Sequence, residues 1–425
     1  ASRLGPPQRV PDDPGWLLFA VASEAASALP AILASHGSPL AAALRRANGR
    51  YLPGVRRSHR FGDHPYTPPP KDAKFTFGEI FAGIGGFRLG LEPLGGRCVC
   101  AVEIDAAAQE TYALNFGRDE LRGDIVDEYA EDMPSMDLLT AGFPCQTFSQ
   151  RGEQAGFDDP RGELFLELAR ILTVRQPRAF LFENVAQLVT LDGGWRPING
   201  DSSHEGSKAG GVLTAILGAF EAAGYVTRWR LLSSERWVAQ KRLRLYIVGI
   251  RSDLAAAALP HFEWPSDEVA DGSRGRVVRD NLEPPDAPDV ARATLTAEQW
   301  ARICSDKFCA KSQRGPACRE LDLDAPSPTI VSSYRKFSSL TTKYVCEERD
   351  GTPRALPRFL TWRECAALMG FPPEFALPAA KRSTAEAITK AESSAYRQFG
   401  NAVIPPVITA VAERLLGVIG VDYTP

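Results

Sequence analysis

The stretch of sequence that decides the fold is FTFGEIFAGIGGFR, residues 75–88. Its first half is an apolar run typical of a strand, and its second half is a glycine-rich turn that leads into helical sequence. Glycines in such a turn permit positive φ and let the backbone approach a ligand closely. The dinucleotide-binding fingerprint would need a third glycine at position 88, where this chain has Arg88. The turn therefore disfavours NAD as the ligand.

Beyond this turn, short apolar runs alternate with longer stretches of helical periodicity. The alternation predicts an α/β fold with a Rossmann-like, doubly wound sheet of parallel strands. In such sheets ligands bind outside the carboxyl ends of the strands, so the residues that follow each strand matter most. The expected strands are residues 75–81, 98–102, 137–141, 179–182 and 244–249, and the expected helices are residues 88–94, 106–115 and 164–173.

Two acidic residues follow expected strands or turns at positions where they could hydrogen-bond to a nucleoside. Glu103 ends the second expected strand, 20 residues after Gly83, where a carboxylate can bind ribose hydroxyls. Asp124 follows a further turn and can accept a hydrogen bond from an exocyclic amine. Together with the glycine-rich turn, these residues favour an adenosyl ligand without a pyrophosphate. A tight turn with a purely structural role is the alternative.

Chemically reactive side chains follow other strands of the same expected sheet. Cys145 lies in GFPCQTFS, residues 142–149, where its thiol could be activated as a thiolate. Glu183 follows the fourth strand, and Arg242 and Arg244 lead into the next one, where they could orient the carboxylate or hold a substrate phosphate or carbonyl. An inert packed thiol and surface ion pairs are the structural alternatives. Their common location beside one sheet favours a functional site.

The ordered motifs of this chain resemble those of DNA (cytosine-5) methyltransferases, which use S-adenosyl-L-methionine. Each motif alone recurs by chance, but the series in this order is highly specific. The resemblance covers residues 75–254 and 354–425. The motifs are Phe81–Gly86, Pro144-Cys145-Gln146, Arg161–Phe165, Glu183-Asn184-Val185, Gln240–Arg244, Arg363-Glu364-Cys365 and Gly400–Val403.

The resemblance implies a mechanism that proceeds through a covalent adduct. Cytosine C5 is a poor nucleophile, so the thiolate of Cys145 would add to C6 and activate the ring. Glu183 would hydrogen-bond or protonate N3, Arg244 would contact the base carbonyl, and Arg242 would support the site. Because a stacked base cannot be reached, the resemblance also implies base flipping, with residues 147–159 as a mobile loop that closes over DNA.

Cofactor and DNA contacts are also implied by position in the resemblance. The product would be S-adenosyl-L-homocysteine, and double-stranded DNA would be the partner. The expected cofactor contacts are Phe81, Gly83, Ile84, Gly85, Gly86, Glu103, Ile104, Asp124, Ile125, Pro144, Leu164, Asn401, Ala402 and Val403. The expected DNA contacts are Gln146, Ser149, Arg151, Arg335 and Lys336.

The sequence divides into four expected parts. Residues 1–74 form an N-terminal extension with a proline-rich linker, residues 75–254 the catalytic cofactor-binding domain, and residues 255–385 a smaller, irregular target-recognition domain with its hinge. Residues 386–425 return to complete the catalytic domain. No role is assigned to the extension, and its most apolar stretch, residues 16–34, is interrupted by charge and proline, which disfavours a membrane span.

Composition narrows the remaining possibilities. Because the net charge is -3, any binding to DNA must come from a local basic surface. Eight cysteines in 425 residues are too sparse for a disulfide scaffold, so we expect an intracellular protein, acting as a monomer. Cys304, Cys309, Cys318 and Cys346 are spaced too widely and unevenly for a typical zinc site, and no metal is expected.

Three other functions compete with DNA methylation, whether in restriction–modification or in epigenetic marking. A tRNA cytosine-5 methyltransferase would share the catalytic core, but the Cys-Phe-Thr segment typical of that branch is missing from this sequence. A catalytically silent DNA-binding regulator would not need to keep Cys145, Glu183, Arg242 and Arg244 together. An NAD-dependent dehydrogenase is disfavoured by the missing third glycine and by the lack of a histidine near the strand ends.

Overall fold

A computed structural model describes most of the chain beyond residue 72. The described residues are 73–144, 164–191, 193, 209–269, 275–305, 309, 312, 315–335, 342–346, 348–349, 352–353, 356–378 and 384–423. The expected N-terminal extension therefore lies almost wholly outside the described residues, as do the expected loop 147–159 and Cys145.

The centre of the protein is a seven-stranded sheet with the order β3-β2-β1-β4-β5-β8-β6. Its apolar strands are buried on both faces, as is usual where helices cover both sides of a sheet. The strands are β1 (Phe75–Ile80), β2 (Gly96–Val102), β3 (Leu121–Arg122), β4 (Leu138–Gly142), β5 (Ala179–Val185), β6 (Tyr225–Ser233) and β8 (Leu243–Arg251). The five strands from β3 to β5 in this order are parallel to one another.

The expectation of an all-parallel sheet was wrong at β8, which runs antiparallel to both neighbours, β5 and β6. The sequence interpretation had also missed β6. Only residues 234–242 connect β6 to β8, and they include the 3-10 turn η7 (Ser234–Arg236) and β7 (Gln240–Lys241). A parallel crossover needs a dozen or more residues, so this short connection requires antiparallel pairing. The start of β8 consequently lies at the same edge of the sheet as the end of β5.

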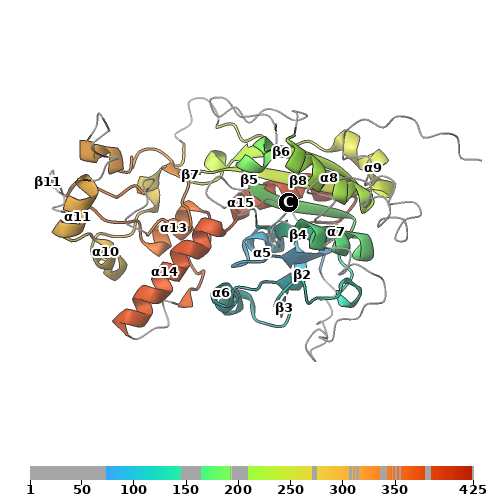
Figure 1. Ribbon diagram of the computed structural model, residues 1–425, viewed down its shortest axis with the longest axis horizontal. Helices are drawn as coiled ribbons and strands as arrows, with labels where there is room; N and C mark the ends of the chain where they lie inside the picture. The colour runs from blue at the N-terminus through green and yellow to red at the C-terminus, as the bar shows by residue number, and fades with distance from the viewer. Residues whose placement is uncertain are drawn as a thin grey trace, which may run out of the picture.

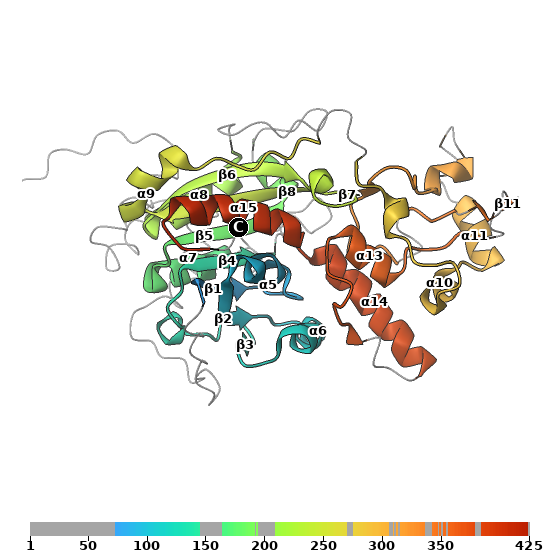
Figure 2. The same ribbon diagram turned by 180° about the vertical axis from the view of Figure 1, so that it is seen from behind.

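Helices cover both faces of the sheet, which confirms the doubly wound arrangement (Figures 1 and 2). Alternation along β5 illustrates this, because Phe180 and Phe182 join the core beneath α7 and α8, whereas Leu181 joins the opposite core. The helices around the sheet are α5 (Gly86–Leu91), α6 (Ala106–Phe116), α7 (Leu164–Arg175), α8 (Gly211–Ala222), α9 (Ser252–Ala258) and α15 (Pro405–Val418). Short 3-10 turns follow α5, β3, β5 and α9 as η1 (Glu92–Leu94), η2 (Ala130–Asp132), η6 (Ala186–Thr190) and η8 (Leu259–His261).

The last helix, α15, covers the first helix of the sheet, α5. A Cβ on Gly90 would lie 2.8 Å from the carbonyl oxygen of Pro405, so only glycine permits this close approach. The hydroxyl of Thr409 donates to the carbonyl of Gly90 at 2.8 Å. The first and last of the helices around the sheet are therefore packed directly together.

Elements between residues 275 and 401 form a second group beside the sheet, on the left in Figure 1. Its helices are α10 (Pro288–Ala293), α11 (Ala297–Cys304), α13 (Trp362–Leu368) and α14 (Ala385–Asn401), with 3-10 turns η9 (Val278–Asn281) and η10 (Gly315–Arg319). Its strands are β9 (Ser327–Pro328), which pairs with β7, and the pair β10 (Glu348–Arg349) and β11 (Thr352–Pro353). A buried ion pair, Arg358 to Glu364 at 2.7 Å, holds the start of α13.

Among the described residues, one stretch is long and apolar enough to cross a membrane by length and composition alone, Glu386–Val418. It consists of α14 and α15, which are separated by a break at residues 402–404. Half of its most apolar window is buried inside the protein, as in the core helices of many globular folds.

Candidate cofactor-binding and active site

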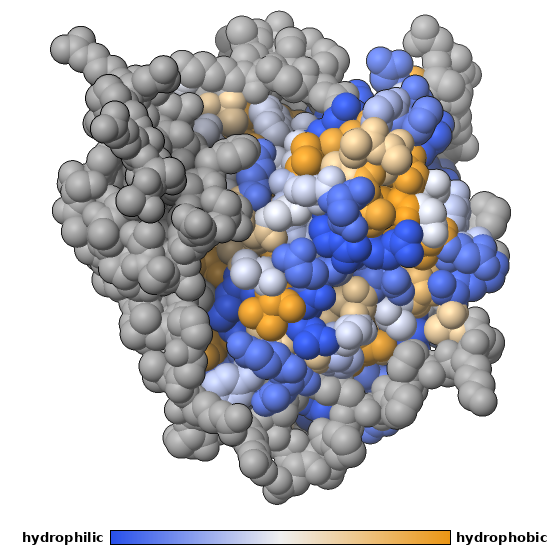
Figure 3. Space-filling model, turned by 90° about the vertical axis from the view of Figure 1, so that its right-hand side faces the viewer, coloured by the Kyte–Doolittle hydropathy of each residue, from blue (hydrophilic) through white to orange (hydrophobic). Residues whose placement is uncertain are grey.

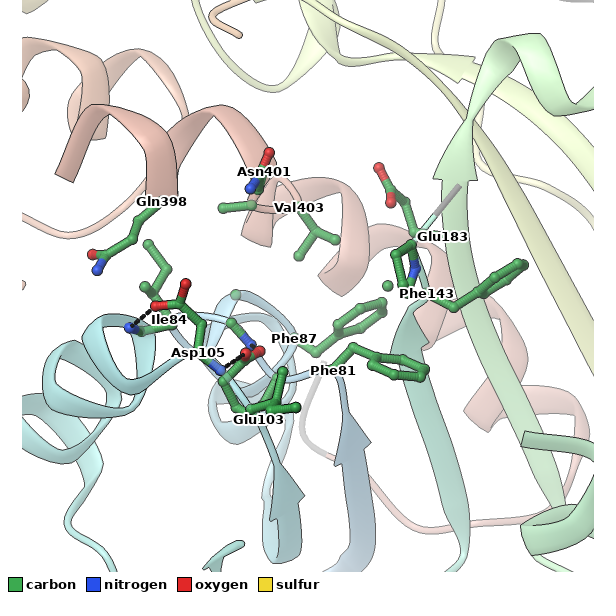
Figure 4. A pocket seen from close by; sticks show the side chains of 18 of the residues that line it. Phe81, Ile84, Phe87, Glu103, Asp105, Phe143, Glu183, Gln398, Asn401 and Val403 are labelled. Carbon is green, nitrogen blue, oxygen red and sulfur yellow. Dashed lines mark hydrogen bonds between the residues drawn. The ribbon is translucent and has the colours of Figure 1, made fainter. Parts of the chain in front are cut away.

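A cavity of about 820 Å³ lies at the carboxyl ends of the parallel strands. It is bordered by the segments that follow β1, β2, β4 and β5, by the start of β8, and by the C-terminal end of α14 (Figure 4). Of the expected site residues, those that line this cavity are Phe81, Gly83, Ile84, Gly86, Glu103, Ile104, Asp124, Ile125, Pro144, Leu164, Glu183, Arg242, Arg244, Asn401, Ala402 and Val403.

The glycine-rich turn forms one wall of the cavity through its backbone. Gly83 has φ +56°, and a Cβ there would meet only the carbonyl oxygen of Phe81, at 4.0 Å, so the turn faces open space. Phe81 has φ 56°, a costly conformation for a residue with a side chain and one that clusters at binding sites. Gly85 differs from the expectation because it does not line the cavity. A Cβ there would lie 2.2 Å from the ring of Phe116, so this glycine serves packing against α6.

Glu103 projects into the cavity from the end of β2, and backbone amides hold its carboxylate. Its Oε2 accepts a hydrogen bond from the amide of Gly83 at 2.8 Å, and its Oε1 accepts one from the amide of Asp105 at 2.7 Å (Figure 4). Burial raises the pKa of this carboxyl, and the two amides oppose that rise. Each oxygen retains acceptor capacity, so the carboxylate can still receive ligand hydroxyls.

The surroundings of Glu103 fit an adenosyl group. Ile104 lines the cavity with 67% of its surface exposed, which is unusual for a large apolar side chain and provides a platform for a flat ring. Asp124 lies on the same wall, with Oδ1 accepting from the amide of Val126 at 3.0 Å. The apolar platform, the carboxylates and the open glycine turn together satisfy what an adenine and a ribose require.

Glu183 and Arg244 form an ion pair on the opposite side of the cavity. Glu183 lies near the end of β5 and Arg244 lies at the start of β8. Arg244 Nε is 3.2 Å from Glu183 Oε1. The antiparallel register, which pairs Val185 with Arg244, places these two side chains at one edge. Burial raises the pKa of Glu183, while the positive charges of Arg244 and Arg242 oppose the rise.

Arg242 is buried and holds three backbone carbonyls together. Its guanidinium donates to Ile330 at 3.0 Å, to Gly400 at 3.0 Å and to Ala402 at 2.9 Å. Burial and the neighbouring Arg244 lower its pKa to about 9. The side chain therefore ties the start of β8 to the β9 region and to the end of α14. It is in place to support the cavity wall.

Sequence reasoning missed several residues that line the cavity, including Phe87, Asp105, Phe143, Asn184, Arg397 and Gln398. Asn184 donates from its side chain to the carbonyl of Phe143 at 3.1 Å, which joins the ends of β4 and β5. Asp105 and Arg397 form an ion pair across 292 residues of sequence. Asn184 stood beside the expected Glu183 and could have been found. The long-range pair carried no signal in the sequence.

Other expected residues lie away from the cavity or outside the described part. Cys145, Gln146, Ser149, Arg151 and Lys336 are outside the described residues, so their expected roles stay predictions. Arg335 packs over the ring of Phe359, with its guanidinium carbon 4.3 Å from the ring centroid. Among the described residues, no group of three or more His, Cys, Asp or Glu side chains could hold a metal ion.

The comparison with known families defines the class of protein. A family model described as C-5 cytosine-specific DNA methylase matches residues 75–417, so the chain belongs to that family. The Type II methyltransferase M.DsaV of Dactylococcopsis salina is 34% identical over 82% of this chain and 87% of its own. M.NlaX of Neisseria lactamica is also 34% identical, over 80% of this chain and 96% of its own.

Solved structures agree on the fold. The Dnmt2 methyltransferase of S. pombe superposes with a TM-score of 0.58 and 20% identity, covering 81% of this chain and 98% of its own. The protein is thus a methyltransferase with a Rossmann-like sheet.

Proposed function

We propose that this protein transfers a methyl group from S-adenosyl-L-methionine to C5 of a cytosine flipped out of double-stranded DNA. The observation that carries the proposal is a single cavity with two chemically different sides. Gly83, Glu103 and Ile104 on one side suit an adenosyl group, and the Glu183–Arg244 pair on the other side suits a polar base. A methyl donor and its acceptor would therefore meet within one cavity.

The chain's own residues supply the activation of the base. The thiolate of Cys145, which follows the cavity residue Pro144 in the sequence, would form a bond to C6 of cytosine and make C5 nucleophilic. Glu183 would give a proton or hydrogen bond to N3, and its raised pKa suits that role. Arg244 would hold both Glu183 and the base carbonyl. Once C5 has taken the methyl group, a base would remove the C5 proton, the C5–C6 double bond would re-form, and Cys145 would leave as the thiolate.

The bound cofactor supplies an electrophilic methyl group on a sulfonium ion. Its adenosyl part would lie against Ile104 and Glu103, and residues 400–403 would close the cavity from the other side. S-adenosyl-L-homocysteine would be the product released. No step requires a metal ion.

The remaining assignments concern DNA and biological setting. Residues 255–385 would recognise the target sequence, and residues 75–254 together with 386–425 would form the catalytic domain. The bacterial relatives named as Type II methyltransferases support a role in restriction–modification on DNA inside the cell. That the protein acts as a monomer stays a prediction. The expected DNA contacts Gln146, Ser149, Arg151, Arg335 and Lys336 belong to this proposal.

The direct test is transfer of a radioactive methyl group from S-adenosyl-L-methionine to duplex DNA and, in parallel, to total tRNA. We expect label on DNA, and bisulfite sequencing of the product would identify the methylated sites. Label on tRNA alone would reassign the protein to an RNA substrate. A bound cofactor with no label on either nucleic acid would favour a silent DNA-binding regulator.

The nucleophile is tested by Cys145→Ser. We expect methyl transfer to disappear, because a serine hydroxyl is far less ionised than a thiol, while binding of duplex DNA in a gel-shift experiment survives. Methyl transfer at the wild-type rate would remove Cys145 from the mechanism.

A further inference from the structure

The last turn of α14 is fastened to the first turn of α6 across the cavity. Arg397 Nη1 lies 2.6 Å from Asp105 Oδ2, and Arg397 Nη2 lies 3.3 Å from Asp105 Oδ1. Both residues line the cavity, and Figure 4 shows Asp105 close to Glu103. Asp105 also caps α6 by accepting hydrogen bonds from the amides of Ala107 and Ala108. The aspartate is therefore held in place by the helix to which it belongs.

A second contact lies next to this ion pair and is shielded from water. The side-chain amide of Gln398 donates to the carbonyl of Ala107 at 2.8 Å, and its oxygen accepts from the hydroxyl of Thr111 at 2.9 Å. Gln398 is buried, whereas the Arg397 side chain is 45% exposed. One contact can be broken by water and salt, and the other is protected.

The chain that follows these two residues forms a wall of the cavity. We use "C-terminal wall" for residues 400–403, all of which line it. Gly400 is packed so closely on the backbone of Ser332 that a Cβ would lie 2.1 Å from the Ser332 nitrogen. Val403 lies against the glycine-rich turn, since a Cβ on Gly86 would be 2.7 Å from its Cγ2. The wall thus contacts Ser332 and the glycine-rich turn, which also line the cavity, and its position depends on how α14 ends.

We propose that Arg397 and Gln398 are positioning residues that hold the C-terminal wall over the cofactor, and that the Arg397–Asp105 pair must open for the cofactor to exchange. This inference rests on the proposed function, because it takes the adenosyl ligand to occupy the Glu103 side of the cavity. The buried Gln398 contact keeps α14 attached while the exposed ion pair opens and closes. Cofactor exchange would then be limited by a contact that neither touches the base nor takes part in methyl transfer.

The test measures release of the cofactor from the full chain, without DNA and without turnover. Protein loaded with tritiated S-adenosyl-L-methionine is diluted into excess unlabelled S-adenosyl-L-homocysteine, and retained label is followed with time. We expect Arg397→Gln and Asp105→Asn to accelerate release by about two- to fivefold, the range set by a partly exposed ion pair. Asparagine preserves the helix cap, so Asp105→Asn removes only the charge.

The matched control is Arg292→Gln, which removes another ion pair of α14. Arg292 Nε lies 3.0 Å from Glu392 Oε1, and the Arg292 side chain is 41% exposed, much like Arg397. Arg292 does not line the cavity. We expect wild-type release rates in this variant, and an intermediate rate in Arg397→Lys, which keeps the charge but not the two-pronged geometry.

Two further measurements make the outcome decisive. The double variant Arg397→Gln, Asp105→Asn should release cofactor no faster than either single variant, because one interaction is lost in all three. Added salt should accelerate release from the wild type and not from Arg397→Gln. Equal rates in wild type and Arg397→Gln, or an equal acceleration in Arg292→Gln, would overturn the proposal. If S-adenosyl-L-methionine showed no binding to the wild type in calorimetry, that result would instead refute the proposed cofactor, and this inference with it.

Discussion

Glu103 and Glu183 stand at the ends of two parallel strands in one cavity, but the protein compensates their charges in different ways. Backbone amides of Gly83 and Asp105 hold Glu103, whereas a guanidinium, that of Arg244, holds Glu183. Burial raises the pKa of both carboxyls. Amides are fixed by the fold and carry no net charge, whereas a guanidinium is a mobile cation that can turn towards a substrate.

This difference indicates how one fold assigns two tasks to the same functional group. A carboxylate held by the backbone is a rigid acceptor suited to binding hydroxyls. A carboxylate held by a side-chain cation can exchange a proton with a base, because the nearby cation stabilises the negative charge whenever the carboxylate is ionised. The two sides of the cavity can therefore be separated experimentally, by variants that affect chemistry and binding independently.

The largest effect is expected from Glu183→Gln, which tests whether Glu183, unlike Glu103, exchanges a proton during the reaction. Glutamine keeps the shape of the side chain but cannot give or take the proton, so we expect the methyl-transfer rate to fall by about 10²–10⁴-fold. Cofactor affinity, measured by calorimetry, should stay at the wild-type value. Methyl transfer at the wild-type rate would show that Glu183 has only a structural role, and the contrast between Glu183 and Glu103 would then be wrong.

A smaller effect is expected from Glu103→Ala on the binding side. The change removes an acceptor for ligand hydroxyls and leaves the amides of Gly83 and Asp105 without their partner. We expect cofactor binding to weaken by about 1–3 kcal/mol in calorimetry, which is the usual consequence of unpaired buried polar groups. Unchanged affinity would show that the adenosyl group lies elsewhere. The variant Glu183→Gln is the matched control in the same experiment.

The smallest effect is expected at a third buried carboxylate, Glu128, which does not line the cavity. Within the described structure its Oε2 has no hydrogen-bond partner, and burial raises its pKa to about 7. Because the folded state then binds the proton more tightly than the unfolded chain, stability should fall as the pH rises from about 4.5 to about 7.

Glu128→Gln removes this pH dependence. We expect the variant to match the wild type in urea unfolding at pH 4 and to exceed it by roughly 1 kcal/mol at pH 8, a figure reduced to allow for screening by solvent. An equal difference at both pH values would mean that packing, and not ionisation, governs this position. The result would show how much the ionisation of a buried carboxylate destabilises the fold when one of its oxygens, Oε2, lacks a donor in the described structure.

The positions of strands could be predicted from the sequence where apolar residues form dense runs. The directions of the strands could not be predicted in this way. The runs that became β1, β2, β4 and β5 lie within residues that are buried on both faces, so hydrophobicity alone marks them. Direction depends on the length of the connection, and β6 was missed because Arg228 and Arg230 interrupt its apolar pattern. The antiparallel course of β8 nevertheless explains why the arginines that lead into it share an edge with Glu183.

The candidate site was predictable where a short motif places its own residues in the cavity. The glycine-rich turn, Glu103 and the Glu183 segment are of this kind. Gly85 was assigned to the cofactor because it belongs to the same turn, but it packs on Phe116 of α6, a contact that only the tertiary structure reveals. Asp105 and Arg397 meet only through tertiary structure, so no local pattern indicates them.

The contact between α5 and α15 has a consequence for how the protein is made. Thr409 and Gly90 are 319 residues apart, so at about 5–20 residues per second a ribosome would release α15 roughly 15–65 s after α5. During that interval the face of α5 that α15 later covers is exposed in the nascent chain. Chaperones could bind this exposed face. Translation that stops before the C-terminal wall would yield a sheet whose cavity lacks residues 400–403 of its lining.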